Sequence, residues 1–213
     1  MNARQAGKNT IPTISGKTLL LSAGGLSGEI DLHGDVAEAL ARLCRFAGHV
    51  PGGVYSVAQH SVLMCDAAQQ ETGDAHLAAI CLLHDGREYV IGDTTTPAQR
   101  FLADIAACAG HDPEAIRFAF SEAGMLLDRL IFKAARIPFP SRQILARVKD
   151  YDVRMLATER AHLLVPSQLS WGAAVETARP IRTRGRIKIW PIARAADEFR
   201  DRLSTYCPTA MRY

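Results

Sequence analysis

The sequence predicts an all-α protein with small β additions. Apolar residues recur at helical spacing from Asp35 to about residue 164, and glycines and prolines divide this stretch into separate helices. Strand-like alternation is confined to the two ends. A chain of 213 residues is long enough for one domain with a sizeable core. We expect an N-terminal arm or small hairpin in residues 1–30 and a single helical domain with a C-terminal extension over 31–213.

The helices are expected where apolar stripes meet start and stop signals. The stretch "DVAEALARLCRF" has apolar residues at i, i+4, i+7 and i+8, with Asp31 or Asp35 available as its cap. Asp74 can cap a helix that should end near Gly92, and Pro97 fits the first turn of the next helix. Further helices are predicted over 55–70, 112–135 and 141–164, the last two separated by Pro138 and Pro140.

Two short segments have the pattern of β-structure. In "KTLLLSAGGLSGEIDL", apolar pieces flank Gly24 and Gly25, which predicts a small hairpin. In "RPIRTRGRIKIWPI", residues alternate around Gly185, which predicts a second small hairpin near residues 181–190. Pro191 then begins a last helix.

Composition narrows the classes of protein that the chain can belong to. Its 48% apolar and 22% charged residues are ordinary for a globular protein, and a net charge of +3 is too small to indicate nucleic-acid binding. No apolar run approaches the roughly 20 residues that span a bilayer, and the polar start lacks the apolar core of a signal peptide. Five cysteines without a CxxC pair indicate free thiols. We therefore expect a cytoplasmic protein with no membrane partner.

The stretch "CLLHDGREYVIGD", residues 81–93, carries the strongest chemical signal. His84 and Asp85 end an apolar helix face, where a buried carboxylate costs several kcal/mol unless it is paired or binds a cation. Imidazole with carboxylate is a ligand set suited to a divalent transition metal. Glu88 shares their helix face and can act as a general acid or base, although a salt bridge is its simpler role. Asp93 follows Gly92, where the chain can fold back over the site.

Further metal ligands must come from elsewhere in the chain. His60 lies in "SVAQHSVLM", an otherwise apolar helix, where a lone histidine is more often a core residue with one hydrogen bond. In "ARVKDYDVRMLATER", Asp150 and Asp152 interrupt an apolar stripe, and either can project inward. A solvated helix face suits Asp150 better.

Three segments of the sequence, in the same order along the chain, resemble the H…HD…D signature of the HD-domain metal-dependent phosphohydrolases, and most closely the branch that contains bacterial 5′-deoxynucleotidases. Residues 58–61 resemble the "AEHS" motif of that branch, with Gln59 in place of its Glu. Residues 84–93 resemble its "HDxxE…GD" segment, with Arg87 where a small residue is usual. Residues 148–152 resemble its "VKxAD" stretch. The likeness covers about residues 35–165.

The resemblance implies a helical HD-type domain, a homodimer and one divalent transition metal ion such as Co, Mn, Zn, Fe or Ni. It makes Glu88 the acid or base and Asp93 a residue that positions water or substrate. Arg45, which precedes an aromatic residue fifteen positions before the motif histidine, would bind phosphate. We also expect His49 either to contact phosphate or to cap its loop. The implied metal ligands are His60, His84, Asp85 and Asp152.

The expected activity is hydrolysis of phosphate from (deoxy)nucleoside monophosphates, as in a 5′-nucleotidase. Two alternatives stay open. One is a triphosphohydrolase that releases tripolyphosphate from deoxynucleoside triphosphates. The other is a non-catalytic module that binds a nucleotide or nucleic acid through the pocket or the basic stretch "RTRGRIKIW". Because such a charge run is usually a solvated edge, the expected partner is a small nucleotide and not nucleic acid.

Overall fold

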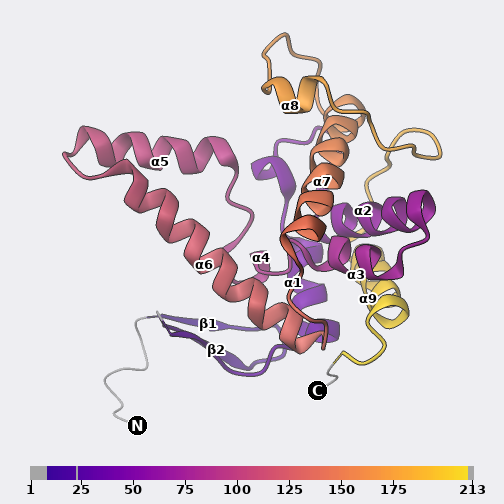
Figure 1. Cartoon of the computed structure of the whole chain (residues 1–213), viewed down its shortest axis with the longest axis horizontal. Coiled ribbons are helices and arrows are strands. Elements are labelled where there is room, and N and C mark those ends of the chain that lie inside the picture. Colours follow the sequence, from indigo (N-terminus) through magenta and orange to yellow (C-terminus); the bar gives the residue numbers. More distant parts are fainter. Residues whose placement is uncertain (1–8, 23, 211–213) are drawn as a thin grey trace.

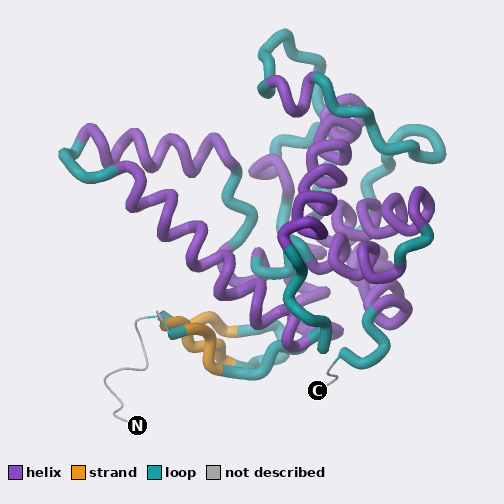
Figure 2. The backbone as a smooth tube through the Cα atoms, viewed as in Figure 1, coloured by secondary structure: helices purple, strands orange, loops and turns teal. Residues whose placement is uncertain are grey.

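A computed structural model describes residues 9–22 and 24–210 of the chain. The described part is mostly helical and includes one small antiparallel sheet near the N-terminus, which confirms the predicted fold class (Figures 1 and 2). The expectation of an N-terminal arm falls in part on residues 1–8, which lie outside the described residues.

The N-terminal sheet contains one strand more than the predicted hairpin. Its strands are β1 (Thr10–Pro12), β2 (Thr18–Ser22) and β3 (Gly25–Ser27), paired antiparallel in that order. Leu19 on β2 is buried, and β3 packs against helix α6. The sheet is therefore attached to the helical body.

Four helices enclose the main hydrophobic core. They are α1 (Ala37–Arg42), α2 (Val57–Thr72), α3 (Ala75–Leu83) and α9 (Ile192–Tyr206). Helices α2 and α3 pack closely together, and α9 contacts α1, α2 and α3. As predicted, α3 begins with a cap in which the Asp74 carboxylate accepts a hydrogen bond from the backbone N–H of Leu77.

The helix predicted from Asp74 to Gly92 is interrupted. Helix α3 ends at Leu83, turns cover residues 84–87, and the short helix α4 (Glu88–Ile91) ends at Gly92. Gly86 lies beneath Ile131 of α6, where an added Cβ would come within 2.9 Å of the Ile131 Cγ2 atom. Gly86 therefore lies in close contact with α6, within the turn that follows α3.

Three longer helices confirm their predicted positions, and one short helix was not predicted. The three are α5 (Thr96–Cys108), α6 (Pro113–Ala134) and α7 (Arg142–Leu163), and the short helix is α8 (Ala173–Glu176). Helices α5 and α6 form an antiparallel pair that extends away from the body (Figure 1). Helix α7 packs against α2 and α3, which places it beside the turn that follows α3.

The predicted hairpin near residues 181–190 is wrong, because the structure assigns no strand within that segment. Its backbone N–H groups bond to side chains instead of to a second strand. Ile181 donates to the hydroxyl of Thr158, and Ile187 donates to the ring of His162. Residues 181–190 thus form an irregular segment that packs across α2 and α7, here called the C-terminal cover.

Two further expectations concern cysteines and membrane-spanning helices. The five cysteines are free thiols, as predicted, and Cys65, Cys81 and Cys207 are buried. Over residues 9–22 and 24–210, every helix is too short or too polar to cross a membrane.

Candidate metal centre

Two imidazole rings face each other at the centre of the helical body. His60 projects from α2 and His84 follows the last turn of α3, and their Nε2 atoms are 3.3 Å apart. Helices α2 and α3 are packed side by side, and this packing brings the two rings close together. The structure brings these two predicted residues together.

The hydrogen bonds of both rings leave both Nε2 atoms without a proton in the neutral state. His60 Nδ1 is 2.6 Å from Glu159 Oε1, and His84 Nδ1 is 2.8 Å from the carbonyl oxygen of Cys81. A carboxylate and a carbonyl only accept hydrogen bonds, so each Nδ1 carries the proton and each Nε2 presents a lone pair. Two lone pairs repel at this distance unless a proton or a cation lies between them.

Two carboxylates complete the group around the Nε2 atoms. Asp85 Oδ2 is 3.0 Å from His84 Nε2 and 3.7 Å from His60 Nε2. Asp152 reaches in from α7, with Oδ1 at 3.6 Å from His60 Nε2. Its neighbour Asp150 points to solvent, as predicted, and pairs with Arg154.

Electrostatics keep the carboxylates charged. Burial alone would raise the pKa of Asp85, but His84, His60 and Arg45 together hold it well below its usual value. Burial likewise opposes ionisation of Asp152, and His84 contributes most to the lowered pKa of that carboxyl. Burial would lower the pKa of His84, yet the charges of Asp85 and Asp152 raise it. These groups therefore attract positive charge, whether a proton or a metal ion.

Glu159 is a central residue of the site that the sequence did not reveal. Its carboxylate is fully buried and accepts hydrogen bonds from His60 Nδ1 and from the Tyr55 hydroxyl, the latter at 2.7 Å. Burial would raise its pKa, but Arg45 and His60 lower it, so the carboxylate is ionised. Glu159 lies seven residues, or two helical turns, beyond Asp152 on α7, so the two side chains share one face of the helix. That spacing is the sequence signal by which Glu159 could have been found.

Arg45 lies between the candidate ligand Asp85 and the buried carboxylate of Glu159. Its Nη1 donates to Asp85 Oδ2 at 3.4 Å and its Nη2 to Glu159 Oε2 at 3.3 Å. Both contacts are long, and its buried Nε has no hydrogen-bond partner among the described residues. The guanidinium is thus next to the cluster, with a donor left over for a further oxygen.

Glu88 and Asp93 lie beside the cluster, and the pKa of each carboxyl is raised. Burial, reinforced by the charges of Asp85 and Asp93, raises the pKa of Glu88 to about 10. Burial also raises the pKa of Asp93. The buried Glu88 Oε2 makes no hydrogen bond within the described part of the chain. A protonated carboxyl beside a metal site is suited to donating a proton.

Three other residues noted in the sequence lie outside the cluster. His49 is exposed, and no described hydrogen bond or ion pair joins its ring to the cluster. Gln59 donates to the carbonyl of Lys188 and accepts from the N–H of Trp190, so this amide fixes the C-terminal cover. Arg87 donates to Asp128 on α6 at 2.7 Å.

The donor set fits a divalent transition metal. His60, His84 and Asp85 form a largely buried group whose ligand atoms lie within 4.8 Å of one another, and this group can bind a metal ion. Glu159 and the Cys81 carbonyl hold the two histidines from behind, an arrangement typical of metal-ligating imidazoles. Asp152 adds a carboxylate at the same place.

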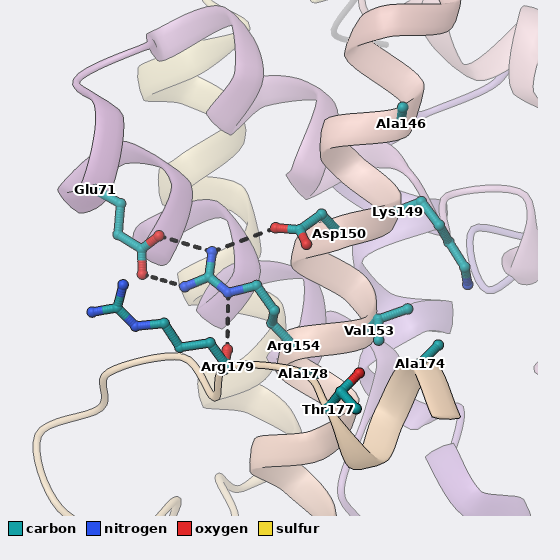
Figure 3. Close-up of a pocket in the computed structure, with 10 residues that line it drawn as sticks. All are labelled: Glu71, Ala146, Lys149, Asp150, Val153, Arg154, Ala174, Thr177, Ala178 and Arg179. Atoms are coloured by element: carbon teal, nitrogen blue, oxygen red, sulfur yellow. Dashed lines mark hydrogen bonds and ion pairs between the residues drawn. The ribbon is translucent and has the colours of Figure 1, made fainter. Parts of the chain in front are cut away.

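A second polar site lies on the outer side of α7 (Figure 3). It is a hollow of about 590 Å³ between the end of α2, α7 and the segment that contains α8. In it the guanidinium of Arg154 donates to both oxygens of Glu71, at 2.9 and 2.7 Å, and to the carbonyl of Arg179. Glu71 and Arg154, at its centre, are thus paired with each other.

Comparison with known proteins gives two partial relatives. No family model matches the chain. It is 31% identical over 137 residues to the uncharacterized protein YfdR of Escherichia coli (strain K12), and the alignment covers 64% of each chain. It is 40% identical over 92 residues to the uncharacterized protein RCAP_rcc00048 of Rhodobacter capsulatus, which covers 40% of this chain and 44% of that protein. The chain thus spans less than two thirds of the length of these relatives.

Proposed function

We propose that the chain is a metal-dependent phosphohydrolase of the HD-domain type that removes phosphate from (deoxy)nucleoside monophosphates. The observation that carries the proposal is the convergence of His60, His84, Asp85 and Asp152, with each imidazole proton held on Nδ1. The likeness of the three sequence segments, in the same order along the chain, supports the choice of reaction class.

The cluster would hold one divalent ion through His60 Nε2, His84 Nε2 and the carboxylates of Asp85 and Asp152. When bound, such an ion lowers the pKa of water and neutralises phosphoryl oxygens, the two effects that hydrolysis of a phosphate ester needs. Both rings are oriented in advance by their Nδ1 hydrogen bonds, so binding requires no change of tautomer.

The other residues of the site have roles that follow from their positions. Arg45 would direct a guanidinium donor at a phosphate oxygen, because its Nε is unsatisfied and its Nη1 already reaches the ligand Asp85. Glu88 would give its proton to the leaving alkoxide, since burial and neighbouring carboxylates keep it protonated at neutral pH. Asp93 would orient water or substrate beside it.

The test is a phosphate-release screen across nucleoside mono-, di- and triphosphates with added Mn²⁺ or Co²⁺. We expect release of inorganic phosphate from monophosphates, and loss of both turnover and bound metal in Asp85→Asn. Asp104→Asn, on the exposed face of α5, is the matched control and should change neither.

Other outcomes of the screen contradict this proposal. Tripolyphosphate from a triphosphate would indicate the triphosphohydrolase instead. Nucleotide binding with no metal-dependent turnover would indicate a binding module. Hydrolysis that survives in Asp85→Asn would remove the metal cluster from the mechanism.

A further inference from the structure

An aromatic pair lies directly beside Arg45 and is not used in the reaction described above. The rings of Phe46 and Trp171 have centroids 6.1 Å apart and planes inclined by 54°. The guanidinium carbon of Arg45 is 5.6 Å from the Phe46 centroid, while Arg45 itself contacts Asp85. From the metal cluster outward, the molecule thus presents carboxylates, a guanidinium and then two aromatic rings.

The backbone at Phe46 adopts an unfavourable conformation to make this arrangement. Phe46 and Ala47 have φ values of 56° and 50°, in the left-handed region that residues other than glycine rarely adopt. Two such residues in sequence follow the residue that reaches the metal cluster. Strain of this kind persists only where surrounding structure enforces it, and it is concentrated at functional sites.

Trp171 is 38% exposed, yet other side chains contact it and fix its position. Arg160 of α7 lies over the indole at 5.2 Å and donates to the carbonyl of Leu169 and to Glu176. The same Glu176 carboxylate accepts a hydrogen bond from the backbone N–H of Trp171 at 2.9 Å. The contacts to Arg160 and Glu176 position the indole within an otherwise irregular surface segment.

We propose that Phe46 and Trp171 form a subsite that stacks on the nucleobase of the substrate, while the phosphate lies at Arg45 and the metal cluster. This inference rests on the proposed function, because it places the phosphate at that cluster. A nucleotide carries its groups in the same order as the protein presents their partners: an anionic phosphate, a sugar and a planar ring. Stacking on aromatic side chains tolerates different bases, so the subsite selects for the presence of a base.

The test compares a nucleoside 5′-monophosphate with 2-deoxyribose 5-phosphate, which lacks the base. In Trp171→Ala we expect KM for the nucleotide to rise about 5- to 100-fold relative to KM for the abasic ester. Trp171→Phe should restore most of the difference, because a phenyl ring still stacks. Leu169→Ala, on the same loop and 76% exposed, is the control and should leave the ratio unchanged. An equal rise for both esters, or no rise, would overturn the subsite even if hydrolysis is confirmed.

A second measurement does not depend on turnover. The chain has two tryptophans, so Trp190→Phe leaves Trp171 as the sole indole reporter. We expect saturable quenching of its fluorescence by a nucleoside monophosphate and much weaker quenching by 2-deoxyribose 5-phosphate. Quenching without any hydrolysis would keep the subsite and reject the proposed function. Absence of quenching would reject the subsite.

Discussion

Two polar clusters lie along helix α7, and they differ in how their charges are balanced. On the outer side, Glu71 and Asp150 are matched by Arg154 and Arg179, and Arg154 bonds to both Glu71 oxygens (Figure 3). On the inner side, carboxylates outnumber cations. The ionised inner carboxylates are Asp85, Asp152 and Glu159, and the cations beside them are Arg45 and Lys149.

The difference in charge balance distinguishes a cluster that only stabilises the fold from one that is suited to binding a cation. A charge-balanced cluster near the surface needs no further partner, and its contribution to stability is modest. Buried carboxylates in excess remain costly until another cation arrives. The inner cluster also presents two unprotonated nitrogens to the same point. Excess negative charge and convergent lone pairs together indicate a cation site, and neither feature occurs in the outer cluster.

The sharpest contrast is between two aspartates on the same helix. Asp152→Ala should weaken binding of Mn²⁺ by more than about 100-fold, because it removes a candidate ligand, an effect beyond that of supporting residues. Asp150→Ala, two residues away and exposed, should leave binding unchanged. Calorimetric titration of both variants checks this, and equal affinities would remove Asp152 from the ligand set.

The next largest effect is expected from the residue behind His60. Glu159→Gln keeps the shape of the side chain but removes the charge that orients the His60 ring and pairs with Arg45. We expect metal affinity to fall about 10- to 100-fold. Unfolding curves of the metal-free variant show whether the chain still folds. Unchanged affinity in a folded variant would make Glu159 a purely structural residue.

The pH dependence of stability tests the state of Glu88 in the metal-free protein. Its pKa is raised from the usual 4.5 to about 10, so the folded chain keeps a proton that the unfolded chain releases. The contribution of Glu88 is therefore full below the unfolded pKa and is lost as pH rises toward the folded value. Between about pH 5 and pH 9, Glu88→Gln should gain stability relative to the natural chain. Urea unfolding at several pH values measures this, and parallel curves would disprove the raised pKa.

The smallest effect is expected in the outer cluster. Glu71→Gln breaks the pair with Arg154 and should lower the free energy of unfolding by about 1 kcal/mol. Metal affinity should not change. A loss of affinity similar to that in Glu159→Gln would show that the two clusters are not independent.

Most of the helices and the candidate ligands His84 and Asp85 were predictable because their signals are local. His84 and Asp85 end an apolar face, and caps such as Asp74 mark helix starts within a few residues. The break after Leu83 was not predicted, and Gly86, in the turn that follows, packs against Ile131 of α6. Nothing in the neighbouring sequence reports that contact.

Glu159 was missed for a related reason. In "LATERAH" it is flanked by polar residues and resembles part of a solvated helix face, yet it is fully buried. Its role depends on partners about a hundred positions away, Tyr55 and His60. The alternation over residues 181–190 predicted a strand where none forms. The segment bonds instead to side chains on α2 and α7.

The central claim is that the inner cluster binds one divalent cation, and calorimetric titration of the metal-free chain with Mn²⁺ tests it most directly. We predict saturable binding of about one ion per chain that is lost in Asp85→Asn and weakens as pH falls, because protons compete for His84. No saturable binding, or binding that persists in Asp85→Asn, would contradict the claim.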